Sequence, residues 1–166
     1  MDLQKVKEVK IPRCYSWNVE SWDELQLHLF CDASEKAFTT VAYFTFQEDI
    51  SCAMVMARTH VAPLKPMSIP RLELQAAVMA SRIAQTVRME HETTINKCHF
   101  WTDSKTVLCW LHSDVHKFKM FVAHRIGEIE ELTDLCDWHW VPSKENVADD
   151  ATRNTYSTDF SAKSRW

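Results

Sequence analysis

The chain has 166 residues, 46% of them hydrophobic and 25% charged, and its formal net charge is -4. These values fit one folded domain with a single core and exclude a disordered chain, and the negative balance excludes a protein that coats nucleic acid by bulk electrostatics. The sequence contains no apolar run of about 18 residues and no apolar N-terminal segment. We therefore expect no membrane span, no signal peptide and an intracellular, cytoplasmic location.

The chain is expected to have three parts. Residues 1–24 lack a clear periodicity and predict an extended approach segment or linker, fixed locally by Pro12. One α/β domain follows over 25–156, and residues 157–166 predict a frayed tail.

The first half of the domain predicts three strands and a long helix. Runs of β-branched and aromatic residues predict strands over 25–31, 38–46 and 51–59. Because only short links separate them, these strands should form an antiparallel meander. Apolar residues then recur at helical spacing after Pro70 and predict a helix over about 71–90.

The second half alternates between the two kinds of element. Strands are expected over 97–101 and 136–141, and helices over 105–112 and 118–132. A last helix starts within 147–153. The order βββαβααβα is typical of an α/β domain with a mixed five-stranded sheet.

Carboxylates stand where this arrangement would bring them together. Asp32 and Asp103 follow apolar strands at their carboxyl ends, where ligands bind in open α/β sheets. Glu73 lies near the start of the long helix, and either Asp149 or Asp150 can supply a fourth acid from the last helix.

Two carboxylates about 4 Å apart repel by about 4 kcal/mol at an effective dielectric near 20, so a divalent cation with oxygen ligands would stabilise the group. Two Mg²⁺ ions could activate water and stabilise the leaving oxygen of a phosphodiester. Taken singly, each acid also fits helix capping or a favourable helix dipole.

Four segments, in this order and spacing, carry a resemblance to a known family: LFCDASEKAF, IPRLELQAA, FWTDSKTVLCWL and WVPSKENVADDATR. Over about residues 10–155 the chain resembles the ribonuclease H domain of retroelement polyproteins, the BEL/Pao-type retrotransposons above all. The resemblance implies a ribonuclease H-like fold with helices flanking a sheet of strand order 3-2-1-4-5. It also implies an endonuclease that uses Mg²⁺, or Mn²⁺ in its place, to cut the RNA strand of RNA–DNA hybrids.

The same resemblance assigns residues and partners. It implies four residues that are both catalytic and metal-binding: Asp32, Glu73, Asp103 and Asp149. Three residues near the acids are candidate substrate contacts: Ser34, Arg71 and Ser104. The implied partners are the hybrid and the reverse transcriptase domain of the same polyprotein, within a retroelement particle.

Several interpretations remain open at this point. Glycines expected in the family are replaced by other residues, which favours a catalytically silent interaction or structural module as the alternative to an enzyme. A different two-metal nuclease on the same fold is a further alternative. Lys117, Lys119 and Arg125 form either a basic strip for phosphates or a solvated helix face.

Overall fold

The computed structural model describes Tyr15 and residues 25–46 and 51–152. The predicted approach segment, apart from Tyr15, and the predicted tail lie outside the described residues. Within them the elements are, in chain order, β1 (Leu25–Ala33), β2 (Ala37–Phe46), β3 (Ser51–Val61), α1 (Ile69–Glu90), β4 (Lys97–Thr102), α2 (Lys105–Leu111), η2 (Val115–Lys117), α3 (Met120–Leu132), η3 (Leu135–Asp137), β5 (Trp138–Trp140) and α4 (Asp149–Thr152). The predicted order of strands and α-helices is confirmed, with two short 3₁₀ turns, η2 and η3, in addition. None of the described helices is long and apolar enough to cross a membrane.

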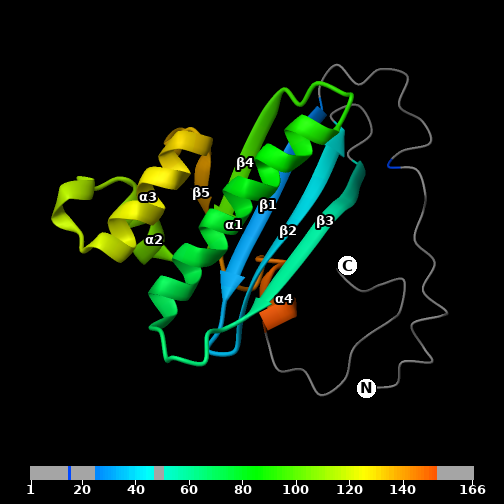
Figure 1. Ribbon diagram of the computed structural model, residues 1–166. Coiled ribbons are helices and arrows are strands. Elements are labelled where there is room, and N and C mark those ends of the chain that lie inside the picture. Colours follow the sequence, from blue (N-terminus) through cyan, green and yellow to red (C-terminus); the bar gives the residue numbers. More distant parts are fainter. Residues whose placement is uncertain (1–14, 16–24, 47–50, 153–166) are drawn as a thin grey trace, which may run out of the picture.

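The five strands form one sheet in the order β3-β2-β1-β4-β5, which confirms the predicted fold class (Figure 1). β1 lies in the middle, antiparallel to β2 and parallel to β4, and β5 is parallel to β4. The register pairs Cys31 of β1 with Thr102 of β4. Because these strands are parallel and in this register, Asp32 and Asp103 follow at the same edge of the sheet.

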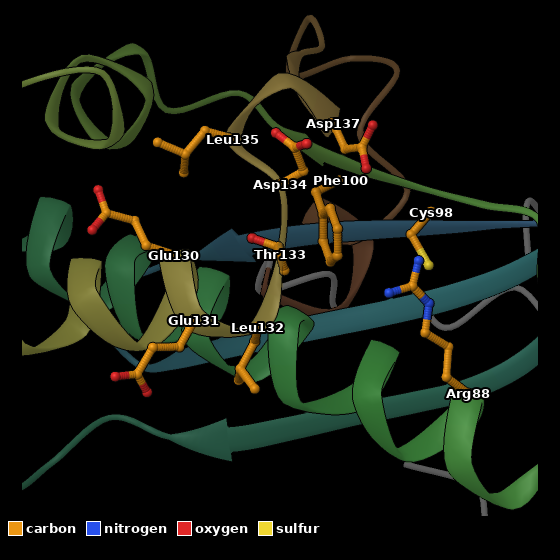
Figure 2. Close-up of a pocket in the computed structure, with 10 residues that line it drawn as sticks. All are labelled: Arg88, Cys98, Phe100, Glu130, Glu131, Leu132, Thr133, Asp134, Leu135 and Asp137. Atoms are coloured by element: carbon orange, nitrogen blue, oxygen red, sulfur yellow. The ribbon is translucent and has the colours of Figure 1, made fainter.

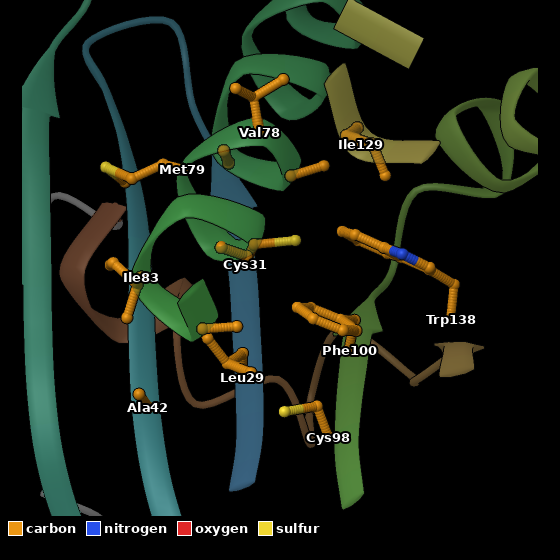
Figure 3. Close-up of a cluster of buried hydrophobic side chains, with 14 of the residues drawn as sticks. Leu29, Cys31, Ala42, Val78, Met79, Ile83, Cys98, Phe100, Ile129 and Trp138 are labelled. Carbon is orange, nitrogen blue, oxygen red and sulfur yellow. The ribbon is translucent and has the colours of Figure 1, made fainter. Parts of the chain in front are cut away.

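The core lies between one face of the sheet and α1 (Figures 1 and 3). Alternate residues of β1 are buried on this face, as the period of two in a strand requires: Leu25, Leu27, Leu29 and Cys31. Phe100 of β4 stacks on Trp138 of β5 with ring centroids 4.7 Å apart. This core holds α1 across the sheet, so that Glu73, near the start of the helix, lies at the edge where Asp32 and Asp103 are found.

Several predicted boundaries are wrong by about two residues. β1 and β3 extend to Ala33 and Val61, beyond the predicted ends at 31 and 59. Two further elements are shifted by 3₁₀ turns. The third helix begins at Met120 instead of 118, and the fifth strand spans Trp138–Trp140 instead of 136–141. In each case an aspartate before a 3₁₀ turn accepts a hydrogen bond from the backbone N–H two residues on: Asp114 from His116 at 3.0 Å, and Asp134 from Cys136 at 3.1 Å. These local side-chain bonds compete with the regular element. A 3₁₀ turn therefore occupies the first predicted residues, and the helix or strand begins after it.

Gly127 in the middle of α3 has no structural need for glycine. A Cβ added there would meet no heavy atom within 4 Å. Alanine should therefore stabilise the helix by lowering the conformational entropy of the unfolded chain. We expect Gly127→Ala to raise the free energy of unfolding by about 0.5 to 1 kcal/mol, measured by urea denaturation. An unchanged or lower midpoint would contradict the open space found beside this residue.

Three histidines lie on adjacent strands on the sheet face opposite α1. The rings of His28 and His99 stack with centroids 4.8 Å apart, and His99 Nδ1 lies 3.3 Å from His139 Nε2. Trp101 Nε1 donates a hydrogen bond of 3.1 Å to His28 Nδ1. Burial, followed by the neighbouring imidazoles of His99 and His139, lowers the pKa of His28 to about 4. Burial also lowers the pKa of His99, so the neutral forms of His28 and His99 are favoured.

This cluster predicts a loss of stability in mild acid. The folded-state pKa of His28 lies below its unfolded value of 6.5, so its contribution is complete above pH 6.5 and is lost as the pH falls toward 4. We expect the free energy of unfolding to fall by on the order of 1 kcal/mol near pH 4 because of His28, after allowing for solvent screening. Urea denaturation between pH 7 and 4 measures it. His28→Phe keeps a ring and removes the titration, so the wild-type protein should lose more stability than the variant; parallel curves would contradict this explanation.

Candidate active site

Five carboxylates line one pocket of about 470 Å³ at the carboxyl edge of the sheet, and four of them, from four parts of the chain, are the predicted acids. Asp32 is the penultimate residue of β1, Asp103 follows β4, Glu73 comes from α1, and Asp149 begins α4. The remaining lining residues are Ala33, Ser34, Glu35, Lys36, Ser143 and Thr152. The four predicted acids are therefore brought together, and Asp149, not Asp150, is the member of the adjacent pair that lines the pocket.

Asp32 is the most enclosed of the acids that face this pocket, with 7% of its surface exposed. The Thr152 hydroxyl donates a hydrogen bond to its Oδ2. Burial raises the pKa of Asp32 to about 6, with further increases from the charges of Asp103 and Asp149, while the Thr152 hydrogen bond acts in the opposite direction. The Thr152 hydrogen bond thus holds the carboxylate in one orientation. It does not offset the effects of burial and of repulsion by Asp103 and Asp149, because the pKa stays raised.

Glu73 is oriented by the start of α2. Ser104 Oγ donates a hydrogen bond of 2.5 Å to Glu73 Oε2 and accepts one of 3.2 Å from the backbone N–H of Val107. Ser104 therefore serves as the N-cap of α2 and as the donor to Glu73. Burial raises the pKa of Glu73, and the charge of Asp103 raises it further against the effect of the Ser104 hydrogen bond.

The loop that carries Asp149 is fastened to β1 by Asn146. This side chain is fully buried, and its Nδ2 donates to the backbone oxygen of Cys31 at 3.1 Å. Its Oδ1 accepts from the backbone N–H of Ala148 at 3.2 Å. Because Cys31 immediately precedes Asp32, one amide side chain fixes the approach of α4 to the first carboxylate.

An exposed tryptophan stands beside Asp103. Trp140 Nε1 donates a hydrogen bond of 3.1 Å to the backbone oxygen of Asp103, and 46% of the tryptophan surface is exposed. Lys105 Nζ lies 5.0 Å from the centroid of the Trp140 ring. A flat apolar face and a cation therefore lie next to the carboxylates, a combination that suits sugars, bases and phosphates.

The three predicted substrate contacts lie in different surroundings. Ser34 lines the pocket, and its hydroxyl accepts from the backbone N–H groups of Lys36 and Ala37 at 3.2 and 3.3 Å. Ser104 is buried beneath Glu73. Arg71 is exposed and lies outside the pocket lining, with its guanidinium 5.1 Å from the Phe121 ring centroid.

Sequence reasoning missed two residues that orient the acids, Asn146 and Thr152. The signal for Thr152 was its place three residues after Asp149, on the same short helix. Asn146 stood in the expected turn of PSKEN, but nothing in the sequence indicated its contact with β1. Both contacts join residues more than 100 positions apart.

The donor set suits hard divalent cations. In the described part of the chain Asp32, Glu73 and Asp103 form no ion pair with a lysine, arginine or histidine, and mutual repulsion contributes to the raised pKa values of Asp32 and Glu73. Carboxylate oxygens are the ligands that Mg²⁺ prefers. No three His, Cys, Asp or Glu side chains among the described residues already surround one point as metal ligands. The pocket thus gathers suitable donors without forming a closed metal cage.

A second pocket, of about 620 Å³, lies at the opposite end of the sheet (Figure 2). It is bounded by the ends of α1 and α3 and by the start of β4, where Arg88 lies beside Cys98. Its acids are Glu130, Glu131, Asp134 and Asp137. None of the four sequence-predicted carboxylates lines it, so it is a separate feature of the molecule.

Comparison with protein families gives one match. The model of the family described as Pao retrotransposon-like RNaseH-like domain matches residues 1–104. This span contains Asp32, Glu73 and Asp103, while Asp149 lies beyond it. No curated protein sequence matches the chain.

Two of the solved structures with a similar fold are ribonucleases H. The N-terminal RNase H domain of a Mycobacterium tuberculosis protein is 13% identical, with a TM-score of 0.53 over 79% of this chain and 92% of that chain. LC11-RNase H1, in a complex with an RNA/DNA hybrid, is 8% identical, with a TM-score of 0.53 over 78% of this chain and 93% of that one. At these identities the similarity shows the fold.

Proposed function

The chain belongs to the family of Pao retrotransposon-like RNaseH-like domains, and we propose that it is a Mg²⁺-dependent endonuclease that hydrolyses the RNA strand of RNA–DNA hybrids. It would act as the ribonuclease H part of a retroelement reverse transcriptase polyprotein, with the reverse transcriptase domain as its neighbour. The observation that carries the proposal is the single pocket lined by carboxylates from β1, α1, α4 and the turn after β4. The hybrid bound to LC11-RNase H1, a protein of the same fold, supports a nucleic acid as the partner.

The four carboxylates would hold the cations. Asp32, Glu73, Asp103 and Asp149 supply only oxygen donors, as Mg²⁺ or Mn²⁺ requires. When bound, two such ions supply the activation of water and the stabilisation of the leaving oxygen. The cations would also neutralise the repulsion that contributes to the raised pKa values of Asp32 and Glu73.

The other residues of the pocket orient these ligands and the substrate. The Thr152 hydroxyl holds Asp32, and the Ser104 hydroxyl holds Glu73. Ser34 lies at the pocket wall, where its backbone and hydroxyl can meet the sugar-phosphate chain. Trp140 and Lys105 provide a stacking face and a cation beside Asp103. Selection of hybrid would then depend on the shape of its shallow minor groove and on 2′-hydroxyl contacts, not on base sequence.

A substrate panel tests this function. The chain is incubated with Mg²⁺ and end-labelled RNA–DNA hybrid, duplex DNA or double-stranded RNA, and the products are separated by size. We expect cuts in the RNA strand of the hybrid alone. Equal cutting of all three duplexes would instead indicate a different two-metal nuclease, and no cutting of the hybrid would favour a silent interaction module.

Ser104→Ala should show how much cleavage depends on the orientation of Glu73, because the substitution removes its hydrogen-bond donor and keeps its carboxylate. The substitution removes the donor to Glu73 and the N-cap of α2, so we expect a loss of about 1 kcal/mol in stability and a 10- to 100-fold slower cleavage. Single-turnover cleavage and urea denaturation measure the two effects.

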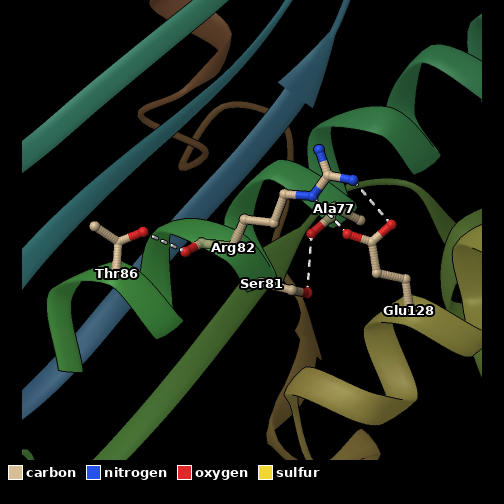
Figure 4. Close-up of polar contacts among 5 residues, drawn as sticks. All are labelled: Ala77, Ser81, Arg82, Thr86 and Glu128. Carbon is tan, nitrogen blue, oxygen red and sulfur yellow. Dashed lines mark hydrogen bonds and ion pairs between the residues drawn. The ribbon is translucent and has the colours of Figure 1, made fainter. Parts of the chain in front are cut away.

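Ser81→Ala is the matched control for this change. Ser81 is also buried, but its hydroxyl donates to the backbone oxygen of Ala77 within α1, away from the pocket (Figure 4). It should leave cleavage unchanged. Ser104→Thr retains a hydroxyl and should recover most of the activity; equal rates for Ser104→Ala and the wild-type chain would refute the orienting role.

A further inference from the structure

Two arginines share one aromatic ring near the pocket. Phe121 and Arg125 come from α3, and Arg71 comes from α1. The guanidinium carbon of Arg125 lies 3.6 Å from the Phe121 ring centroid, and that of Arg71 lies 5.1 Å from it. Cation–π contacts therefore direct two positive groups at one ring, and an anion beside the ring would be attracted by both.

Glu128, an acid on the same helix as Arg125, already pairs with another arginine. Arg82 Nε and Nη2 donate to the two carboxylate oxygens of Glu128 at 2.5 and 3.0 Å (Figure 4). In the described part of the chain, no ion pair joins Arg71 or Arg125 to a carboxylate. Glu128 also attracts the Arg125 guanidinium at longer range, but its two carboxylate oxygens are bonded to Arg82, whose own charge opposes that effect.

Arg125 also has hydrogen-bonding capacity left over. Its Nη1 donates to the backbone oxygen of Phe121 at 3.0 Å, which fixes the plane of the guanidinium against the ring. Its Nε is buried and has no hydrogen-bond partner among the described residues. A buried donor without an acceptor is costly, so an incoming anion that accepts from the guanidinium would be favoured.

The cluster lies within one turn of α1 from Glu73, on the side of the helix that contacts α3. Arg71 precedes Glu73 by two residues in α1, and Phe121 lies in the first turn of α3. Exposed Lys117 and Lys119 come just before that turn. In a chain with a net charge of -4, positive side chains thus gather at the start of α3 and the start of α1, the helix that also carries Glu73.

We propose that Arg71, Phe121 and Arg125 form a second nucleic-acid contact, which binds a backbone phosphate of the duplex whose scissile bond lies in the carboxylate pocket. This inference rests on the proposed function, because it places the same substrate across both sites. Guanidinium groups match phosphate oxygens with paired hydrogen bonds, and stacking on Phe121 fixes both groups before the phosphate arrives. The cluster would set the affinity for the duplex and its position relative to the pocket, while the carboxylates carry out the chemistry.

Equilibrium binding tests the cluster separately from cleavage. Binding of fluorescent RNA–DNA hybrid is measured across a range of salt concentrations with Asp103→Asn as the common background, so that no substrate is consumed. Arg71→Gln and Arg125→Gln should each weaken binding about 5- to 20-fold and lower the slope of log affinity against log salt by about 1. Phe121→Leu keeps both charges but loses the stacking face, and should weaken binding by a smaller factor.

Arg88→Gln is the matched control, because it removes the same charge from the opposite end of α1. It should change affinity and salt slope by less than Arg71→Gln does. In the active chain, the arginine variants should raise KM and leave kcat at saturating hybrid unchanged. Arg71 is exposed, so its variant keeps the test valid if Arg125→Gln fails to fold.

The outcomes separate this inference from the nuclease proposal. Cleavage of hybrid with unchanged binding in Arg71→Gln would overturn the cluster and leave the nuclease intact. Loss of binding in the arginine variants of a chain that cleaves nothing would support the cluster and overturn the nuclease. A chain that binds no hybrid at all would overturn the cluster as a contact.

Discussion

Asp103→Asn is expected to lower the rate of hybrid cleavage by about a thousandfold or more and, at the same time, to raise the melting temperature of the metal-free protein. Asp103 faces Asp32 and Glu73, and its charge contributes to the raised pKa of each. An asparagine of the same shape removes this repulsion but provides a poorer cation ligand. Relief on the order of 1 kcal/mol corresponds to a rise of about 2 to 4 °C for a chain of this size.

Two measurements check these opposite effects. Single-turnover cleavage reports the rate, and thermal unfolding in a chelator reports the stability. Millimolar Mg²⁺ should raise the melting temperature of the wild-type chain more than that of the variant, because only binding to the folded state contributes. Asp137→Asn changes the same charge at the opposite end of the sheet and should affect neither cleavage nor the response to Mg²⁺. A variant at position 103 that cuts hybrid at the wild-type rate would exclude Asp103 from the reaction.

The order of elements was predictable because each signal is local. A period of two marks β1, where alternate residues are buried, and a period of 3.6 marks α1. The strand order was expected from the family resemblance, since sequence periodicity does not say which strands pair. That order brings Asp32 and Asp103 to one edge, so the gathering of the acids followed from topology. Their catalytic role stays a prediction.

The contacts that orient these acids could not be predicted in the same way. The bond from Asn146 to Cys31 and the bond from Thr152 to Asp32 each depend on how a late loop docks on the first strand. The stacking of Arg71 on Phe121 likewise depends on how α1 and α3 pack. No local pattern encodes such pairs, because their partners are set by the folded chain as a whole. For the same reason the buried bond from Ser104 to Glu73 could not be predicted, and a substrate contact at Ser104 stays a prediction.

The second large effect is expected at Asn146, which lies outside the carboxylate set. Asn146→Ala removes the donor to Cys31 and the acceptor for Ala148, and it leaves these buried backbone groups with one partner fewer. We expect a loss of about 2 to 3 kcal/mol in the free energy of unfolding. Because the loop then no longer fixes Asp149 near Asp32, cleavage should slow tenfold or more even in the fraction that is folded. Urea denaturation and single-turnover cleavage below the unfolding midpoint measure the two effects.

Asn146→Asp separates the two hydrogen bonds within this one side chain. The aspartate keeps an acceptor for the Ala148 N–H but has no donor for Cys31, and it adds a negative charge near Asp32. If fastening the loop to β1 is what matters, this near-isosteric variant should be at least as impaired as Asn146→Ala. Asp134→Ala removes a comparable backbone-capping bond from η3, far from the pocket, and should reduce stability without slowing cleavage. Wild-type cleavage by folded Asn146→Asp would mean that Asp149 reaches its position without the bond to Cys31, and the proposed coupling between the last loop and the first strand would be wrong.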